Sequence, residues 1–255
     1  MTPPASNGAA TGPGLGLGPG VRLVEAGGAP LLARPYFAGG DPGPIVAALA
    51  LVPELLEATA PFLGAVLGPS AVPLRLKEMV ILRTSARASC RYCVEAHTVV
   101  ARDAGLTVAE VRALRGEADI DGVFADASER AAIGWCDAVV DTGAIPEGAR
   151  AALASSFPEH LVVELTLLAA TTLLLNRFCT ALRLPTSPAV LDRLAAEGLA
   201  AEGPAAEGPA AEGPAAEGPA AEGPAAEGPA AEGPAAEGLA AEGLAAEGLA
   251  AEGPA

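Results

Sequence analysis

Residues 74–104 read LRLKEMVILRTSARASCRYCVEAHTVVARDA, and their apolar side chains recur at helical spacing. The pattern predicts two helices, over residues 74–88 and 90–104. Ser89 stands where an N-cap residue opens the second helix, and Gly105 stands where a left-handed residue ends it. The candidate chemistry of the chain is concentrated in this pair of helices.

One side of the second predicted helix gathers two thiols and an imidazole. At about 100° per residue, Cys90, Cys93 and His97 fall within a sector about 60° wide. On the preceding helix, Glu78 lies on the apolar stripe, where a surface helix would carry a leucine. The opposite side of the second helix is charged, with Arg91, Glu95, Arg102 and Asp103. We therefore expect the two thiols and the imidazole to face the packed interior.

Two cysteines at Cys-x-x-Cys spacing suit thiol redox chemistry. Their sulfurs lie on adjacent positions of one helical turn and can form a disulfide with little chain movement. The helix N-terminus favours the thiolate, but its contribution of about 0.3–1 kcal/mol lowers a thiol pKa by less than one unit. A base is needed as well. His97 is placed to accept a proton, and Glu78 is placed to orient His97 and to restore its proton.

Helix start and stop signals continue through the rest of the central chain. No stretch with the two-residue period of a strand interrupts it. Proline and glycine residues mark the breaks between further predicted helices, over residues 43–51, 54–67, 107–115, 128–141, 146–156 and 158–182. The predicted fold class is all-α, with one domain over residues 21–194, which is long enough to bury a core.

The remaining cysteines, the second histidine and two aromatic residues are predicted to serve the structure rather than the chemistry. Cys136 and Cys179 stand in apolar helical patterns, where a free cysteine usually packs. His160 is expected at the surface in the first turn of its helix. Trp135 is expected in the core or an interface, and Tyr92 is expected to pack or to line an entrance.

Both ends of the chain differ in composition from its centre. Residues 1–20 are rich in glycine, proline and alanine, and we expect them to be disordered. Residues 195–255 hold twelve five-residue units, Ala-Ala-Glu-Gly followed by Pro or Leu, and are predicted to form an extended low-complexity tail. The tail carries twelve of the sixteen net negative charges. The nearly balanced remainder lacks the basic footprint of a nucleic-acid binder.

The longest apolar run, over residues 161–175, is expected to be a core or subunit-interface helix. Polar residues interrupt it, and it is shorter than the roughly 18 residues that suggest a membrane span. The amino terminus lacks the basic and then apolar pattern of a secretory signal. We expect a cytoplasmic protein that does not bind a membrane.

The spacing Glu78-x11-Cys90-x2-Cys93-x3-His97, between two amphipathic helices, resembles the core motif of the AhpD-like alkylhydroperoxidases within the carboxymuconolactone decarboxylase family. All four motif positions match, and the similarity extends over about residues 45–184. The resemblance implies a compact all-α domain that forms a homo-oligomer, a trimer or hexamer. It also implies a thiol peroxidase without a metal or an organic cofactor.

The resemblance further implies a role for each motif residue. Cys93 would attack the hydroperoxide and become a sulfenic acid, and Cys90 would resolve it as a disulfide. His97 and Glu78 would relay protons, and an external dithiol such as a lipoylated protein would reduce the disulfide. The helix terminus acts most strongly on the first cysteine of such a pair, which favours Cys90 as the nucleophile, so the order of attack stays open.

Other interpretations stay open at this point. The two thiols could be packing residues or zinc ligands, although Cys90 and His97 are about 10 Å apart along a continuous helix, too far to share one ion. Glu78 could instead pair with an arginine such as Arg75. A lactone decarboxylase would need acid and base groups but no thiol pair. A redox sensor would oxidise once without sustained turnover.

Overall fold

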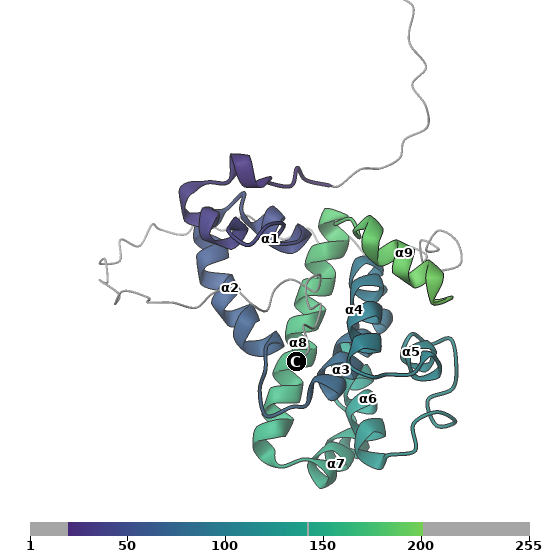
Figure 1. The fold of residues 1–255 in the computed structure, drawn as a ribbon. Coiled ribbons are helices and arrows are strands. Elements are labelled where there is room, and N and C mark those ends of the chain that lie inside the picture. Colours follow the sequence, from purple (N-terminus) through teal and green to yellow (C-terminus); the bar gives the residue numbers. More distant parts are fainter. Residues whose placement is uncertain (1–19, 142, 201–255) are drawn as a thin grey trace, which may run out of the picture.

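The computed structural model describes residues 20–141 and 143–200, and every regular element in these ranges is a helix (Figure 1). The predicted all-α class is confirmed for this part of the chain. The predictions of a disordered segment over residues 1–19 and of an extended tail beyond residue 200 lie outside the described residues. Two 3-10 helices, η1 (Ala26–Gly28) and η2 (Leu31–Phe37), precede α1 (Pro44–Leu49), α2 (Pro53–Leu67), α3 (Leu74–Arg87), α4 (Arg91–Asp103), α5 (Val108–Leu114), α6 (Ala127–Val140), α7 (Glu147–Ser156), α8 (Glu159–Leu182) and α9 (Pro188–Ala196).

Helix α8 runs through the middle of the domain, and α3 lies beside it (Figure 1). Helix α3 packs against α4, α6 and α8, and α8 also contacts α2 and α7. One side of α8 is buried, with Leu165, Leu168 and Ala169 in the core that it shares with α3 and α6. By length and composition alone α8 could cross a membrane. These contacts instead make it the core helix of the domain, as predicted for residues 161–175.

Most helices begin close to where the sequence predicts, at a capping side chain or at a proline. Thr107 and Glu110 form a capping box at the start of α5. Proline occupies the first turn of α1, α2 and α9. Helix α6 differs, since its N-cap is Asp126, whose carboxylate accepts hydrogen bonds from the N–H groups of Ser128 and Glu129. Ser128, the first residue of the helix predicted over residues 128–141, lies inside α6.

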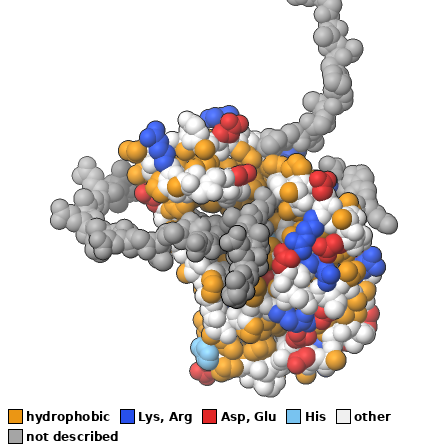
Figure 2. Space-filling model, viewed as in Figure 1, with side chains coloured by type: hydrophobic (Ala, Val, Ile, Leu, Met, Phe, Trp, Pro, Cys, Tyr) orange, Lys and Arg blue, Asp and Glu red, His pale blue; other side chains and the backbone are white. Residues whose placement is uncertain are grey.

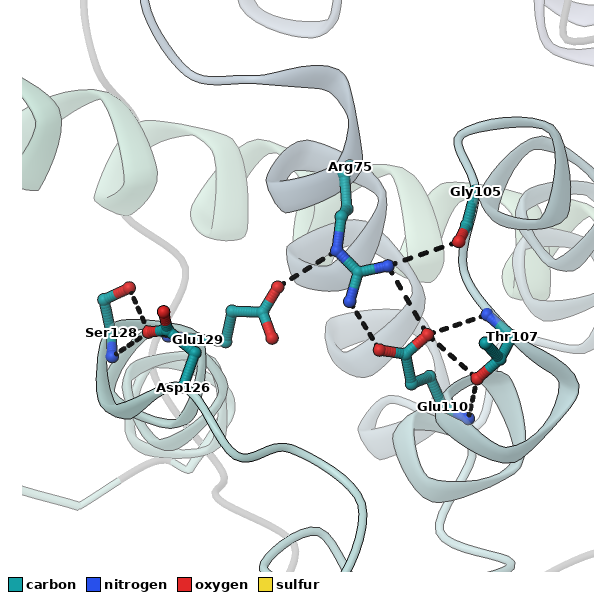
Figure 3. Close-up of polar contacts among 7 residues, drawn as sticks. All are labelled: Arg75, Gly105, Thr107, Glu110, Asp126, Ser128 and Glu129. Atoms are coloured by element: carbon teal, nitrogen blue, oxygen red, sulfur yellow. Dashed lines mark hydrogen bonds and ion pairs between the residues drawn. The ribbon is translucent and has the colours of Figure 1, made fainter.

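Arg75 on α3 ties three helices together (Figure 3). Its guanidinium lies 2.5 Å from the Glu110 carboxylate of α5 and 3.0 Å from the Glu129 carboxylate of α6. It also donates a hydrogen bond to the carbonyl of Gly105, at the end of α4. Arg75 is thus fully engaged with α5 and α6 and does not pair with Glu78.

Helix α9 was not predicted, and its last two residues, Ala195 and Ala196, belong to the first low-complexity unit, residues 195–199. It packs against α4, and Leu199 behind it is 2% exposed. Glu197 pairs with Arg102 of α4 at 2.8 Å and with Arg193 at 3.0 Å. This first unit ends in leucine rather than proline, and the leucine side chain is buried. The folded domain therefore extends past the predicted boundary at residue 194 and includes Leu199.

The charged side of α4 is partly covered, since α9 and the segment before it pack against it, while Arg91 and Asp103 stay exposed. Glu95 is 5% exposed, and its carboxylate accepts hydrogen bonds from Arg91 at 2.8 Å and from the Thr186 hydroxyl at 2.5 Å. Asp103 pairs with Arg193 of α9. The helical projection had separated these charges correctly from the thiols. It did not reveal that a further helix would pack against them.

Candidate active site

Glu78 on α3 and His97 on α4 meet in the interior. Glu78 Oε2 lies 2.9 Å from His97 Nδ1, and the two side chains are 5% and 23% exposed. Burial lowers the pKa of the His97 imidazole, but the Glu78 carboxylate and the nearby Cys90 outweigh it and raise this pKa above its ordinary value. A carboxylate at Nδ1 orients the ring and leaves Nε2 for proton transfer.

Three cysteines, rather than the two that the motif contains, meet beside this pair. Cys90, Cys93 and Cys179 are 1%, 4% and 1% exposed. Their sulfur atoms all lie within 4.8 Å of one another. Cys179 comes from the last turn of α8, which contacts α4. Cys179 was predicted to be a packing residue, because no local pattern indicates that the end of α8 meets the start of α4.

Cys90 is held by the turn that joins α3 to α4. The Cys90 N–H donates a 3.0 Å hydrogen bond to the carbonyl of Ser85, and the Ser89 N–H donates one of 3.1 Å to the carbonyl of Ala86. Ser89 has a left-handed φ of 54°, so this turn is a Schellman motif that ends α3. The N-cap of α4 is therefore Cys90, and the predicted cap at Ser89 is wrong. Cys90 makes no side-chain cap, and its thiol hydrogen bonds to other cysteines.

The same motif occurs at the other helix end of the cluster. Arg183 has a φ of 51°, and the Leu184 N–H donates a 3.0 Å hydrogen bond to the carbonyl of Cys179. Ser89 and Arg183 are the only non-glycine residues with positive φ in the described part of the chain. A left-handed backbone costs a residue with a Cβ about 1–2 kcal/mol. Unfavourable backbone of this kind often lies at functional sites, and here it flanks the thiols.

Hydrogen bonds among the thiols distribute negative charge unequally. Those from Cys179 and Cys93 outweigh burial and hold the pKa of Cys90 well below its ordinary value. The hydrogen bond with Cys179 lowers the pKa of Cys93, but the hydrogen bond to Cys90, burial and the charge of Cys90 raise it to about 12. Hydrogen bonds to Cys90 and Cys93 raise the pKa of Cys179. The reduced site therefore favours a thiolate at Cys90 and neutral thiols at the other two positions.

Two cavities lie next to the thiol cluster. One of about 180 Å³ is bounded by Tyr92, Glu95 and Leu184. The other, of about 490 Å³, lies between the segment around Leu23 and the loop that follows α8. Tyr92, Leu184 and Leu23 also pack against the cysteines, so these side chains separate the cavities from the sulfurs. Tyr92 thus lines a cavity beside the site, as predicted.

The other candidate residues lie away from this site. The Cys136 thiol is buried and donates to the carbonyl of Ala132. Trp135 packs in the core and donates to the Thr166 hydroxyl at 3.1 Å, and His160 is exposed at the start of α8. The three clustered thiols could also hold a soft metal ion, because thiolates are preferred ligands of zinc and monovalent copper.

Comparison with known proteins finds a family match over part of this site. Residues 53–138 match the model of the carboxymuconolactone decarboxylase family, and this range contains Glu78, Cys90, Cys93 and His97 but not Cys179. No curated protein matches the chain by sequence.

Several solved structures share the fold. A peroxidase-related protein with an alkylhydroperoxidase AhpD core from Ralstonia eutropha JMP134 has a TM-score of 0.59 and 18% identity, covering 68% of this chain and 94% of its own. A peroxidase-related protein from Silicibacter sp. TM1040 has a TM-score of 0.58 and 21% identity, and the match covers 68% of this chain and 93% of that protein. The debrominase Bmp8 has a TM-score of 0.57 and 22% identity, and the match covers 68% of this chain and 95% of Bmp8. Residues 53–138 therefore resemble the carboxymuconolactone decarboxylase family, and the described residues share the AhpD-like fold of these solved structures.

Proposed function

We propose that the protein is a thiol peroxidase that reduces organic hydroperoxides through a disulfide formed in its buried thiol cluster. The observation that carries this proposal is the grouping of Cys90 and Cys93 with the Glu78-paired His97. The fold supports a peroxidase-related or a decarboxylase-like role. The thiols favour the first, because decarboxylation of a lactone has no use for a buried thiol pair.

The first step is attack of the Cys90 thiolate on the outer oxygen of the hydroperoxide. The O–O bond breaks, the alkoxide takes a proton from the His97 imidazolium and leaves as an alcohol, and Cys90 becomes a sulfenic acid. The hydrogen bonds that favour the Cys90 thiolate support this order. It is the reverse of the order implied by the family resemblance, in which Cys93 attacks.

In the second step the Cys93 sulfur attacks the sulfenic sulfur. An S–S bond forms, and the hydroxyl group leaves as water with the thiol proton. Glu78 keeps the His97 ring oriented throughout, so that it acts as a positioning residue for the proton donor. An external dithiol then reduces the disulfide by exchange and is itself oxidised. We propose a lipoyl group carried by another protein as this donor.

The larger cavity supports an organic rather than an inorganic peroxide as the substrate. Its walls include the apolar side chains of Leu23, Val24 and Phe37, and it lies beside the thiol cluster. An alkyl or aryl group would bury apolar surface there, at about 25 cal/mol per Å². Hydrogen peroxide has no apolar group that could be buried against these side chains.

Steady-state kinetics test the proposal. The reduction of cumene hydroperoxide by dihydrolipoamide is measured with the wild type, the Cys90→Ser/Cys93→Ser double variant, and Cys136→Ser as the matched control. We expect turnover in the wild type and the control and none in the double variant. An unchanged rate in the double variant would exclude the dithiol mechanism. Because the matched structures include the debrominase Bmp8, one of them in complex with 2,3,4-tribromopyrrole, this brominated pyrrole is assayed in parallel. Its turnover without hydroperoxide turnover would assign the thiols to reductive dehalogenation.

We also propose that the protein is a cytoplasmic homo-oligomer, assembled through the exposed apolar side of α8 and its neighbour α2. The exposed side chains on these helices are Leu55 and Phe62 of α2 and Val163, Leu167 and Leu174 of α8. Hydrophobic side chains gather at the lower left of the face in Figure 2, around the lower part of α8. An exposed apolar surface of this kind favours association with a second copy of the chain.

A further inference from the structure

Cys179 lies outside both the Cys-x-x-Cys motif and the part of the chain that matches the family. We propose that Cys179 is a third redox-active cysteine, able to replace either Cys90 or Cys93 in the catalytic disulfide. The proposal depends on the proposed function for the physiological oxidant, but disulfide formation itself can be tested without a peroxide.

The positions of the three sulfurs carry this inference. The limit of 4.8 Å applies to every pair, so Cys179 lies within the same limit of Cys90 and of Cys93 as these lie of each other. A disulfide requires about 2.05 Å between sulfurs, and side-chain rotation with small backbone shifts can close the difference. The fourth cysteine, Cys136, lies apart from these sulfurs. It is buried in another core cluster, where its thiol donates a hydrogen bond to the carbonyl of Ala132.

The backbone around Cys179 can accommodate such a shift. Cys90 is the N-cap of α4, and Cys179 lies in the last turn of α8, so both belong to helix ends, which deform more readily than helix centres. Cys93 lies in the first turn of α4. The cluster therefore brings together two helix termini from elements that are distant in sequence.

The chemistry needs no additional reactant. A sulfenic acid at Cys90 or at Cys93 is attacked by the Cys179 sulfur, the S–S bond forms, and the hydroxyl group leaves as water with the thiol proton. In the wild type, the Cys179 thiol can also lose its proton and attack Cys90 in a Cys90–Cys93 disulfide. That exchange forms Cys90–Cys179, releases Cys93, which takes up a proton, and leaves the number of disulfides unchanged. Leu184, which packs against Cys179, lines the smaller cavity and marks the side from which a dithiol could approach.

The test uses the full-length protein with Cys90→Ser and Cys93→Ser, each with and without Cys179→Ser. Reduced samples are oxidised either with diamide, which takes up two electrons and two protons to become a hydrazine, or with cumene hydroperoxide. They are then denatured and alkylated with N-ethylmaleimide, and intact masses and peptide maps identify the disulfides. The wild type and Cys136→Ser are the controls. Circular dichroism checks folding, and alanine variants repeat the series in case serine disrupts the apolar site.

The chain has four cysteines, so each single variant retains three thiols. We expect diamide to leave only Cys136 open to alkylation in both single variants, through Cys93–Cys179 and Cys90–Cys179 disulfides. Both double variants should form no intramolecular disulfide. If the wild type forms a disulfide but both folded single variants keep three free thiols, the inference is wrong and the proposed function stands. If diamide gives these disulfides but cumene hydroperoxide oxidises neither the wild type nor any variant, the proposed function is wrong. The inference that Cys179 is redox-active then still holds.

Discussion

Removing the imidazole of His97 should have a defined energetic cost. In His97→Ala, the Glu78 carboxylate loses its partner at 2.9 Å while its side chain stays only 5% exposed. Removal of one partner from a buried ion pair costs about 3–5 kcal/mol, because the other charge is left without compensation. The His97 side chain is 23% exposed, so water can partly replace it. We therefore expect the free energy of unfolding to fall by about 3 kcal/mol, the lower end of that range.

The cost should depend on pH in one direction. Glu78 and Cys90 raise the pKa of His97 in the folded protein, against the effect of burial. The protonated ring therefore contributes stability fully below about pH 6.5, the ordinary histidine value, and loses that contribution as the pH rises through the raised value. The difference in stability between the wild type and His97→Ala should be larger near pH 6 than near pH 9.

Urea unfolding followed by circular dichroism at the two pH values measures this difference. His160→Ala is the matched control, because His160 is exposed and should change stability little at either pH. Adding Glu78→Gln to His97→Ala should recover part of the loss, since no buried charge then remains. The reasoning would be refuted by a difference that is the same at both pH values, or by a double variant no more stable than His97→Ala.

Four further outcomes are expected. Leu199→Ala should lower the free energy of unfolding by about 2–5 kcal/mol in urea titrations, because Leu199 is 2% exposed. A negligible change would show that the first repeat unit is not part of the folded domain. Ser89→Gly should raise it by about 1 kcal/mol by relieving the left-handed backbone at φ 54°, and a loss of stability would contradict that explanation. Iodoacetamide should label Cys90 at lower pH than Cys93, whose pKa is raised to about 12, and mass spectrometry would show the opposite order if the charge assignment is wrong. Leu167→Glu should convert the oligomer to a monomer in size-exclusion chromatography with light scattering, whereas a monomeric wild type would rule out the proposed interface.

Much of the fold could be predicted from local sequence signals. Proline, glycine and capping residues predicted the helices from residue 43 to residue 182 to within a few residues, because each signal acts within one helical turn. Helix α9 was missed although Ser187 and Pro188 supply the same local signals, an N-cap side chain and a first-turn proline. The residues from Ala195 onward have the composition of a low-complexity repeat, and composition does not reveal the burial of Leu199 or the ion pair between Glu197 and Arg102.

The candidate site could likewise be predicted only in part from the sequence. Glu78, Cys90, Cys93 and His97 could be proposed from spacing, because they lie on two consecutive helices whose faces follow from the helical period. Cys179 is 86 residues beyond Cys93, and its place beside the pair depends on how α8 packs across α4. The burial of Glu95 depends in the same way on a distant segment, since its carboxylate accepts a hydrogen bond from Thr186, which precedes α9. Local sequence patterns do not predict such long-range packing.

A single-turnover measurement tests the central claim most directly. Fully reduced protein is mixed without any external thiol with excess cumene hydroperoxide, and the alcohol formed is quantified together with the intact mass of the protein. The account predicts one equivalent of alcohol per chain and a loss of two hydrogen atoms, from one disulfide among Cys90, Cys93 and Cys179. No alcohol, or alcohol accompanied only by added oxygen on the sulfurs, would contradict it.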